Sequence, residues 1–224
     1  MPMKGSGATT MAEIDRFDGG VGWLAYPDER MERASHALVT DEGLYLVDPV
    51  DCEGLDDLLD EYGDVAGCVV LLDRHNRDAD ALARRHDVSV YRPAWMESID
   101  PNYLAPVEDI GVELGDTGYE VFQLYDTPFW SEAYLYHPEE KTLVVPEALG
   151  GAEYFRAGDE RVGVHPMLRM TPPRELTAYD VDRLLVGHGP GVMDRATSAI
   201  RDAVGGSRRR APTAYFQMLR GLLD

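Results

Sequence analysis

The sequence predicts an α/β fold of four layers, in which two mixed β-sheets lie face to face and helices cover each outer face. Strand-like segments fall into two groups along the chain, and helical patterns accompany each group. With 224 residues and 44% hydrophobic content, the chain can also form one substantial core. Two β-rich halves that are each covered by helices fit an αββα sandwich of this kind.

The first half alternates strand and helix patterns around a central polar loop, residues 73–78. Leucines at 55, 58 and 59 predict a helix over 54–62, and helical spacing returns over 79–86. The expected strands are 14–17, 21–26, 35–40, 43–47, 69–72 and 88–91. Polar loops at the carboxyl ends of strands are where α/β proteins usually place ligands and chemistry, so 73–78 is the candidate site.

The second half reads as a meander of strands followed by helices. The expected strands are 110–114, 119–124, 133–137 and 142–145, with a last strand ending at Val186 and helices over 194–204 and 212–223. Residues 150–173 show no clear period, and such a long excursion often forms a lid or a contact surface. We expect a disordered lead-in over 1–12, one domain over 13–206, and a C-terminal helix within 207–224.

The charge balance bears on partners and location. The chain has 41 acidic and 21 basic residues, a net charge of -20, and its acids are scattered over every segment. This composition indicates adaptation to concentrated salt, and without a basic face it argues against a nucleic-acid partner. The sequence has no run of about 18 apolar residues, the length needed to cross a membrane. The lead-in also lacks the apolar middle of a signal peptide. We therefore expect a cytoplasmic protein that does not contact membranes.

Five short landmarks along the chain carry a family resemblance. They are Gly43 to Pro49 (GLYLVDP), Val70 to Ala79 (VLLDRHNRDA), Thr127 to Trp130 (TPFW), Val145 to Ala148 (VPEA) and Val186 to Gly189 (VGHG). Over residues 14–204 they resemble the metallo-β-lactamase superfamily, whose landmarks are a strand ending in Asp-Pro, H-x-H-x-D-H, T-P-G-H, a G-D turn and G-H-G. The resemblance implies an αββα sandwich with any active site between the sheet edges.

The resemblance also shows where this chain departs from the family, whose members hold two metal ions. The corresponding residues here are Arg74, Asn76, Asp78, Ala79, Trp130, Glu147 and His188. Arg74, Asn76 and Trp130 stand in place of the first metal's three histidines. None of them is an ordinary zinc ligand, so we expect that site to be empty. The second metal's set keeps Asp78, Glu147 and His188.

Our first hypothesis is a protein without a cofactor that has lost catalysis and acts in binding or assembly. Two carboxylates in a partly buried site need a cation or raised pKa values, and Arg74 would supply a permanent positive charge. An ion-pair network of Arg74 with Asp78 and Glu147 would then replace the metal. Asp78 could instead simply favour the start of a helix, and Trp130 could simply fill the vacated pocket.

The alternative hypothesis is a mononuclear metal-dependent hydrolase. Asp78, Glu147 and His188 are ligand types that zinc or manganese accepts, and His75 could swing in as a fourth. A metal-bound water would then be the nucleophile. Asp48, at the end of its strand, would support the site from behind, and His188 could instead be a fold relic bonded to Asp48 or Asp78.

A third hypothesis is an interaction protein. The apolar residues of the last predicted helix could dock on an unknown protein partner or form a homodimer, or could pack on the parent domain. They are Tyr215, Phe216, Met218, Leu219 and Leu222.

Overall fold

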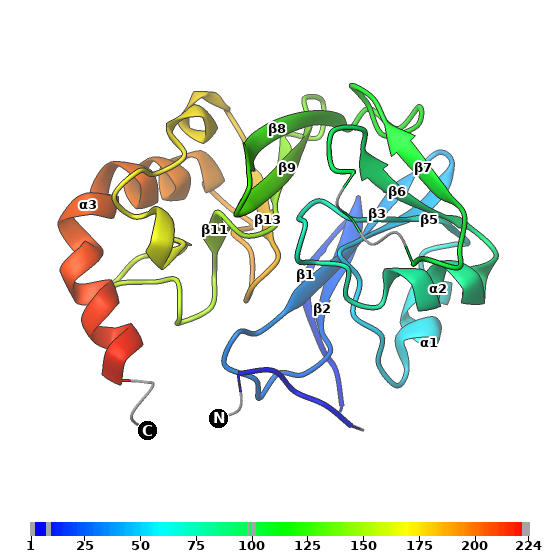
Figure 1. Cartoon of the computed structure of the whole chain (residues 1–224), viewed down its shortest axis with the longest axis horizontal. Helices are drawn as coiled ribbons and strands as arrows, with labels where there is room; N and C mark the ends of the chain where they lie inside the picture. The colour runs from blue at the N-terminus through cyan, green and yellow to red at the C-terminus, as the bar shows by residue number, and fades with distance from the viewer. Residues whose placement is uncertain (1–2, 8–9, 98, 100–101, 221–224) are drawn as a thin grey trace.

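A computed structural model of the chain describes residues 3–7, 10–97, 99 and 102–220 (Figure 1). Seven strands form the first sheet in chain order: β1 (Ala12–Phe17), β2 (Gly20–Leu24), β3 (Ala34–Thr40), β4 (Gly43–Val47), β5 (Val65–Val69), β6 (Ser89–Pro93) and β7 (Val107–Ile110). The first four strands pair antiparallel, and β4 to β7 pair parallel. Parallel neighbours need crossover connections, and two of these carry α1 (Leu55–Asp60) and α2 (Ala79–His86).

The second sheet has four strands in the order β13 (Arg183–Val186), β10 (Thr142–Val145), β9 (Trp130–His137) and β8 (Glu120–Thr127). Strands β8 to β10 form an antiparallel meander, and β13 joins β10 in parallel. A small ladder of β11 (Leu149–Gly150) and β12 (Gly163–Val164) follows. The 3-10 helices η1 (Pro166–Leu168) and η2 (Arg174–Ala178) and the long helix α3 (Ala196–Arg220) complete the described chain.

Side-chain alternation along the strands makes the layers. Val144 of β10 packs into the core between the two sheets, whereas Leu143 and Val145 pack with apolar residues of α3. Helices α1 and α2 lie on the outer side of the first sheet, and α3 covers the second sheet (Figure 1). The predicted αββα sandwich of two mixed sheets is confirmed.

Backbone hydrogen bonds join the two sheets at the edge where the polar loop leaves β5. The Ala133 N–H donates to the Leu71 carbonyl at 2.8 Å, and the Asp73 N–H donates to the Ser131 carbonyl at 3.1 Å. On the other side, the Ala34 N–H donates to the Gly187 carbonyl at 2.9 Å. These bonds bring the loop after β5 against the loop after β13.

Three predicted elements differ from the structure. The strand expected over 69–72 is β5, which ends at Val69. Strand β7 covers Val107–Ile110 and pairs parallel with β6, so the segment predicted over 110–114 does not open the meander. The helices predicted over 194–204 and 212–223 are one helix through Arg220, with Pro212 inside it. Its buried residues Ala203, Ser207, Ala211 and Ala214 recur at helical spacing, and this continuous packed face outweighs the hydrogen bond that Pro212 cannot donate.

The aperiodic excursion over 150–173 is anchored to α3. Glu160 accepts from the Arg169 guanidinium at 2.6 Å and from Nε of Arg210 on α3 at 2.6 Å, and both Glu160 and Arg169 are buried. The excursion therefore packs as part of the domain.

The two ends of the chain bear on the predicted lead-in and C-terminal helix. Within the lead-in, the Gly5 N–H donates to Glu29 Oε2 at 2.6 Å, and residues 1–2 and 8–9 lie outside the described part. At the other end, Phe216 is 67% exposed, and Leu222 and the Leu219 side chain fall outside what the structure describes. None of the described helices is both long and apolar enough to cross a membrane.

Candidate metal centre

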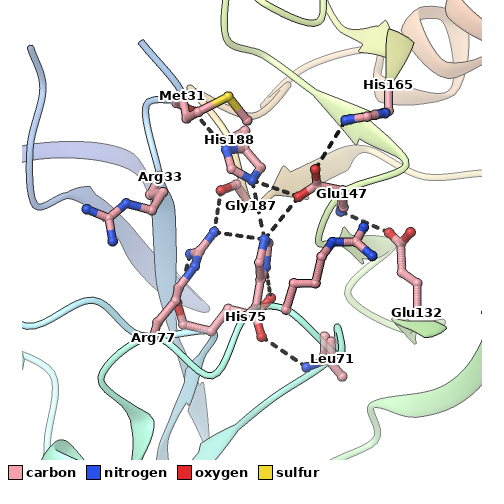
Figure 2. A network of polar contacts seen from close by, with 12 residues as sticks. Met31, Arg33, Leu71, His75, Arg77, Glu132, Glu147, His165, Gly187 and His188 are labelled. Carbon is pink, nitrogen blue, oxygen red and sulfur yellow. Dashed lines mark hydrogen bonds and ion pairs between the residues drawn. The ribbon is translucent and has the colours of Figure 1, made fainter. Parts of the chain in front are cut away.

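Three side chains from three different loops converge between the sheet edges. His75 follows β5, Glu147 follows β10 and His188 follows β13, and Figure 2 shows their tips pointing toward one another. Glu147 Oε2 lies 3.0 Å from His75 Nε2 and 2.8 Å from His188 Nε2, and the two Nε2 atoms are 3.3 Å apart. The side chains are 7%, 9% and 4% exposed, respectively. This compact cluster could hold a metal ion.

The other ring nitrogen of each histidine is already engaged. His188 Nδ1 lies 2.7 Å from the Met31 carbonyl, which can only accept, so this nitrogen carries a hydrogen. His75 Nδ1 lies 2.8 Å from Asp48 Oδ2, the carboxylate–histidine arrangement that fixes the same tautomer. In the neutral rings both Nε2 atoms are then lone-pair acceptors, and they face a third acceptor, Glu147 Oε2. Three converging acceptors are relieved either by a proton on one of the rings or by a metal ion among them, and two imidazoles with a carboxylate suit a divalent metal.

The second oxygen of Glu147 is oriented by His165. His165 Nδ1 accepts from the Met167 N–H at 3.2 Å, so its Nε2 carries the hydrogen, and this nitrogen lies 3.3 Å from Glu147 Oε1. Burial lowers the pKa of His165 to about 4, which keeps the ring neutral at pH 7. His165 therefore turns Glu147 Oε2 toward the cluster without adding charge.

Electrostatics favour the ligand forms of the cluster. Burial alone would raise the pKa of Glu147, but the charges and hydrogen bonds of His188 and His75 hold it well below its usual value. Burial lowers the pKa of His188, with Glu147 opposing the shift. An ionised Glu147 carboxylate beside a His188 imidazole that readily loses its proton is the state that a metal ion requires.

Asp48 connects the cluster to the first sheet. The Leu71 N–H donates to Asp48 Oδ1 at 2.9 Å, which leaves Oδ2 for His75. Its backbone is left-handed, with φ 45°, an uncommon conformation for a residue other than glycine. Through this bond Asp48 lies behind His75 and not behind His188.

Arg77 is a site residue that the sequence analysis missed. One nitrogen of its guanidinium donates to the Gly187 carbonyl at 2.9 Å and lies 3.4 Å from His75 Nε2 (Figure 2). Its other terminal nitrogen donates to the Asp48 carbonyl at 2.8 Å. Burial lowers the pKa of Arg77, yet a guanidinium stays charged in proteins, so it offsets the negative charges of Asp48 and Glu147. The sequence signal that could have identified Arg77 was its position two residues after His75 in the polar loop.

Glu132 was also missed, because it looks like any polar residue within a strand. It is fully buried on β9, and its Oε1 accepts from the N–H groups of Glu147 at 2.9 Å and Ala148 at 2.8 Å. Burial raises the pKa of Glu132 to about 7. This carboxyl fixes the backbone that presents Glu147.

Two glycines around His188 permit close approach of the loops. A Cβ on Gly187 would lie 2.2 Å from the Pro146 carbonyl oxygen and 3.2 Å from His75 Cε1. Gly189 has φ +71°, and a Cβ there would lie 2.2 Å from the Ala152 nitrogen. The Gly-His-Gly sequence is thus required for His188 to reach Glu147.

The expected ion-pair network of Arg74 with Asp78 and Glu147 is wrong. Arg74 donates to Asp73 at 3.2 Å and to the Phe129 carbonyl at 3.1 Å, and its guanidinium lies 4.4 Å from the centre of the Trp130 ring. The side chains of His75 and Arg77 point into the cluster. The side chain of Arg74, the residue before His75, points away from it. The loop is in a different register from the one that the resemblance implied.

The other predicted loop positions also lie outside the cluster. Asp78 Oδ2 accepts from the Asp51 N–H at 2.9 Å, next to the start of α2, so His75 takes the place expected for Asp78 in the ligand set. Asn76 accepts from the Tyr103 hydroxyl at 2.8 Å, and Ala79 is buried in the core.

Trp130 fills space beside the cluster. It is 7% exposed, its Nε1–H donates to Glu132 Oε2 at 2.6 Å, and its ring centre is 5.0 Å from that of His165. Together with Arg74, it occupies the region where the resemblance placed ligands of a first metal.

Comparison with known proteins identifies the fold that holds this cluster. No protein-family model and no curated protein matches the sequence. The crystal structure of DIM-1 metallo-β-lactamase exposed to ceftazidime superimposes with a TM-score of 0.64 at 15% identity, covering 93% of this chain and 100% of that one. The chain has the metallo-β-lactamase fold. The predicted resemblance is confirmed at this level.

Two further solved structures superimpose on this chain. TTHA1623 in a di-iron-bound form gives a TM-score of 0.55 at 20% identity, covering 81% of this chain and 95% of that one. Rubredoxin oxygen:oxidoreductase from the anaerobe Desulfovibrio gigas gives 0.64 at 13% identity, covering 88% of this chain and 61% of that one.

The expectation that the chain has no cofactor is contradicted. His75, Glu147 and His188 form a group that could hold a metal ion, and one structural neighbour is a di-iron-bound form. The expectation failed because it treated the loop after β5 as having lost its ligands, whereas His75 supplies one from the neighbouring position.

Proposed function

We propose that this protein is a metal-dependent hydrolase with one metal ion held by His75 Nε2, Glu147 Oε2 and His188 Nε2. The observation that carries the proposal is the convergence of these three acceptors while both Nδ1 atoms bind Asp48 and the Met31 carbonyl. Two histidines and a glutamate are a ligand set of catalytic zinc sites, and they leave a coordination position for water.

The surrounding residues would act by orientation and charge. A divalent metal bound here would supply the Lewis acidity that makes water a nucleophile at neutral pH. Asp48 and the Met31 carbonyl hold the two imidazole rings, and His165 holds Glu147. Arg77 adds a fixed positive charge next to His75, where it would favour a reaction that develops negative charge.

The proposal is for one metal and not two. The resemblance assigns the first metal's histidine positions to Arg74, Asn76 and Trp130, and the stacked pair of Arg74 and Trp130 occupies that region. Neither side chain is an ordinary zinc ligand. The one candidate group found among the described residues, His75, Glu147 and His188, supports a single ion.

A cleft of about 430 Å³ is lined by Asp73, Arg74, Trp95, Glu97, Asp126, Thr127, Pro128 and Ser131. The side chains of Arg74, Trp130 and His165 connect this cleft to Glu147, so substrate would approach from this side. Because three carboxylates and one arginine line the cleft, it favours neutral or cationic substrates over anions.

The donor set favours a second candidate, an iron-dependent oxidoreductase. Two histidines and one carboxylate with open positions are also the ligand set of non-haem iron(II) oxygenases. The metal that supports turnover separates the two candidates, because the oxidoreductase requires iron whereas the hydrolase can work with zinc, which is redox-inert.

Metal content tests the proposal. The full-length protein is incubated with zinc, manganese or, without air, iron(II), then desalted and analysed by elemental mass spectrometry. We expect close to one ion per chain, lost in His75→Ala and in His188→Ala and retained in Asp78→Asn, the matched control from the alternative ligand set. A wild-type protein that binds none of the three metals, or a His188→Ala variant with full occupancy, would contradict it.

Turnover then tests the reaction class. The loaded protein is assayed with ester, thioester and phosphodiester substrates and, separately, for oxygen consumption. Hydrolysis by the zinc-loaded or manganese-loaded form that disappears in His188→Ala supports the hydrolase. Oxygen consumption by the iron form alone supports the second candidate.

A further inference from the structure

Three arginines line a groove between α3 and the segment that leads into η2. The groove has a volume of about 400 Å³ and is lined by Pro172, Arg174, Thr177, Arg201, Val204, Gly205 and Arg208. All of these residues are distinct from those of the metal centre. A cavity of this size is within the range of small-molecule sites.

Helix geometry places two of the arginines on one face. Arg201 and Arg208 are seven residues apart on α3, with Val204 and Gly205 between them at helical spacing. Arg174, at the start of η2, lines the groove from the other segment. Both segments that form the groove therefore contribute arginine, and Val204 and Pro172 add apolar surface to its lining.

The guanidinium groups are held in place but lack carboxylate partners. Arg201 Nε donates to the Thr177 carbonyl at 3.3 Å, and Arg208 Nε donates to the Met170 carbonyl at 2.8 Å. Within the part of the chain that the structure describes, neither these two nor Arg174 forms an ion pair. The terminal nitrogens of the Arg201 and Arg208 forks are thus free to bind a ligand.

Most of the other arginines whose side chains the structure describes have acidic partners. Acidic residues outnumber basic ones by 41 to 21, and arginines elsewhere, such as Arg85 and Arg161, pair with carboxylates. Three unpaired guanidiniums around one hollow act against the overall negative field and concentrate anions there. Arginine forks match the oxygens of phosphate and carboxylate groups.

We propose that this groove binds a small molecule that carries several phosphate or carboxylate oxygens. The guanidinium groups of Arg174, Arg201 and Arg208 bind the oxygens, and Val204 and Pro172 contact the ligand's apolar part. The site is independent of the metal centre, so it does not rest on the proposed hydrolase activity.

Isothermal titration calorimetry on the full-length, chelator-treated protein tests the proposal, with inorganic pyrophosphate and citrate as separate probes. Removing metal beforehand keeps the metal centre from contributing to either titration. We expect saturable binding of at least one probe, weakened about tenfold or more by Arg201→Gln and by Arg208→Gln. Because these side chains are exposed, both variants should keep the wild-type unfolding temperature.

Arg209→Gln is the matched control, since Arg209 is an exposed neighbour on the same helix that does not line the groove. It should weaken binding less than twofold. Pyrophosphate binding without citrate binding would assign a phosphorylated ligand, and the reverse would assign a polycarboxylate. If neither probe binds, or if Arg209→Gln weakens binding as much as Arg208→Gln, the proposal is overturned.

Discussion

His75 and His188 face each other with their Nε2 atoms 3.3 Å apart, although they lie 113 residues apart in the chain. Neither ring can turn away, because Nδ1 of His75 bonds Asp48 and Nδ1 of His188 bonds the Met31 carbonyl. Neutral rings held in this way would present two lone pairs to each other and to Glu147. A metal ion in the centre would remove this repulsion, and the proposed metal centre is testable from several directions.

Replacing Asp48 with Asn should weaken metal binding without removing a ligand. The substitution takes away the carboxylate that fixes the His75 tautomer and raises the basicity of its ring, and such changes typically cost about 10- to 100-fold in affinity. Competition with a chromogenic chelator measures the affinity. Asp56→Asn removes the same charge at an exposed ion pair with Arg85 and should change the affinity less than about twofold. Equal effects of the two variants would show that Asp48 acts only through net charge.

Replacing Trp130 with Ala should accelerate metal release. The Trp130 ring contacts His165 and lies under Arg74, so its removal opens a path from the cleft toward Glu147. We expect loss of metal to excess chelator about tenfold faster or more, which corresponds to a lowering of the barrier by about 1.4 kcal/mol. Phe129→Ala is the control, because Phe129 is 87% exposed and engages Arg74 only through its backbone carbonyl. Unchanged release from Trp130→Ala would mean that the ion leaves by another route.

Much of the fold could be predicted because burial leaves a periodic pattern. Leu143, Val144 and Val145 alternate between two cores, as a strand between two layers must. The landmarks also identified Glu147 and His188, whose places depend on short loops after β10 and β13.

The register of the polar loop could not be predicted in the same way. Which side chains enter the site depends on the backbone bonds that tie residues 71 and 73 to β9, and on the left-handed backbone of Arg77 with φ 41°. Met31 contributes only its carbonyl, and His165 arrives from an aperiodic excursion. Neither residue type nor sequence spacing indicates that the Met31 carbonyl and His165 belong to the site.

Glu132 should make stability depend on pH near neutrality. Burial raises its pKa to about 7 from 4.5, so between these values the folded protein binds a proton that the unfolded chain does not. By linkage, the contribution of this group to the unfolding free energy falls as pH rises from 5 through 7. The full loss is on the order of 1–3 kcal/mol.

Denaturant unfolding of the metal-free protein at pH 5.5 and pH 8 measures this dependence. Wild type should lose more stability over the interval than Glu132→Gln, in which the titrating group is absent. The variant should also be less stable overall at pH 5.5, because a Gln amide cannot accept from both the Trp130 indole and the two backbone N–H groups. Glu139→Gln, on an exposed turn, should keep the wild-type pH dependence. The same slope in wild type and Glu132→Gln would assign the dependence to other groups.

Replacing Glu160 with Gln should destabilise the protein severely without changing its metal content. Glu160 is buried and neutralises two guanidiniums, those of the fully buried Arg169 and of Arg210, so the variant leaves buried positive charge uncompensated. Breaking a buried pair from one side typically costs about 3–5 kcal/mol. Asp202→Asn removes the exposed partner of Arg210 and should cost less than about 1 kcal/mol. If both variants unfold at the same denaturant concentration, the excursion over 150–173 is held to α3 by its apolar contacts and not by this ion-pair network.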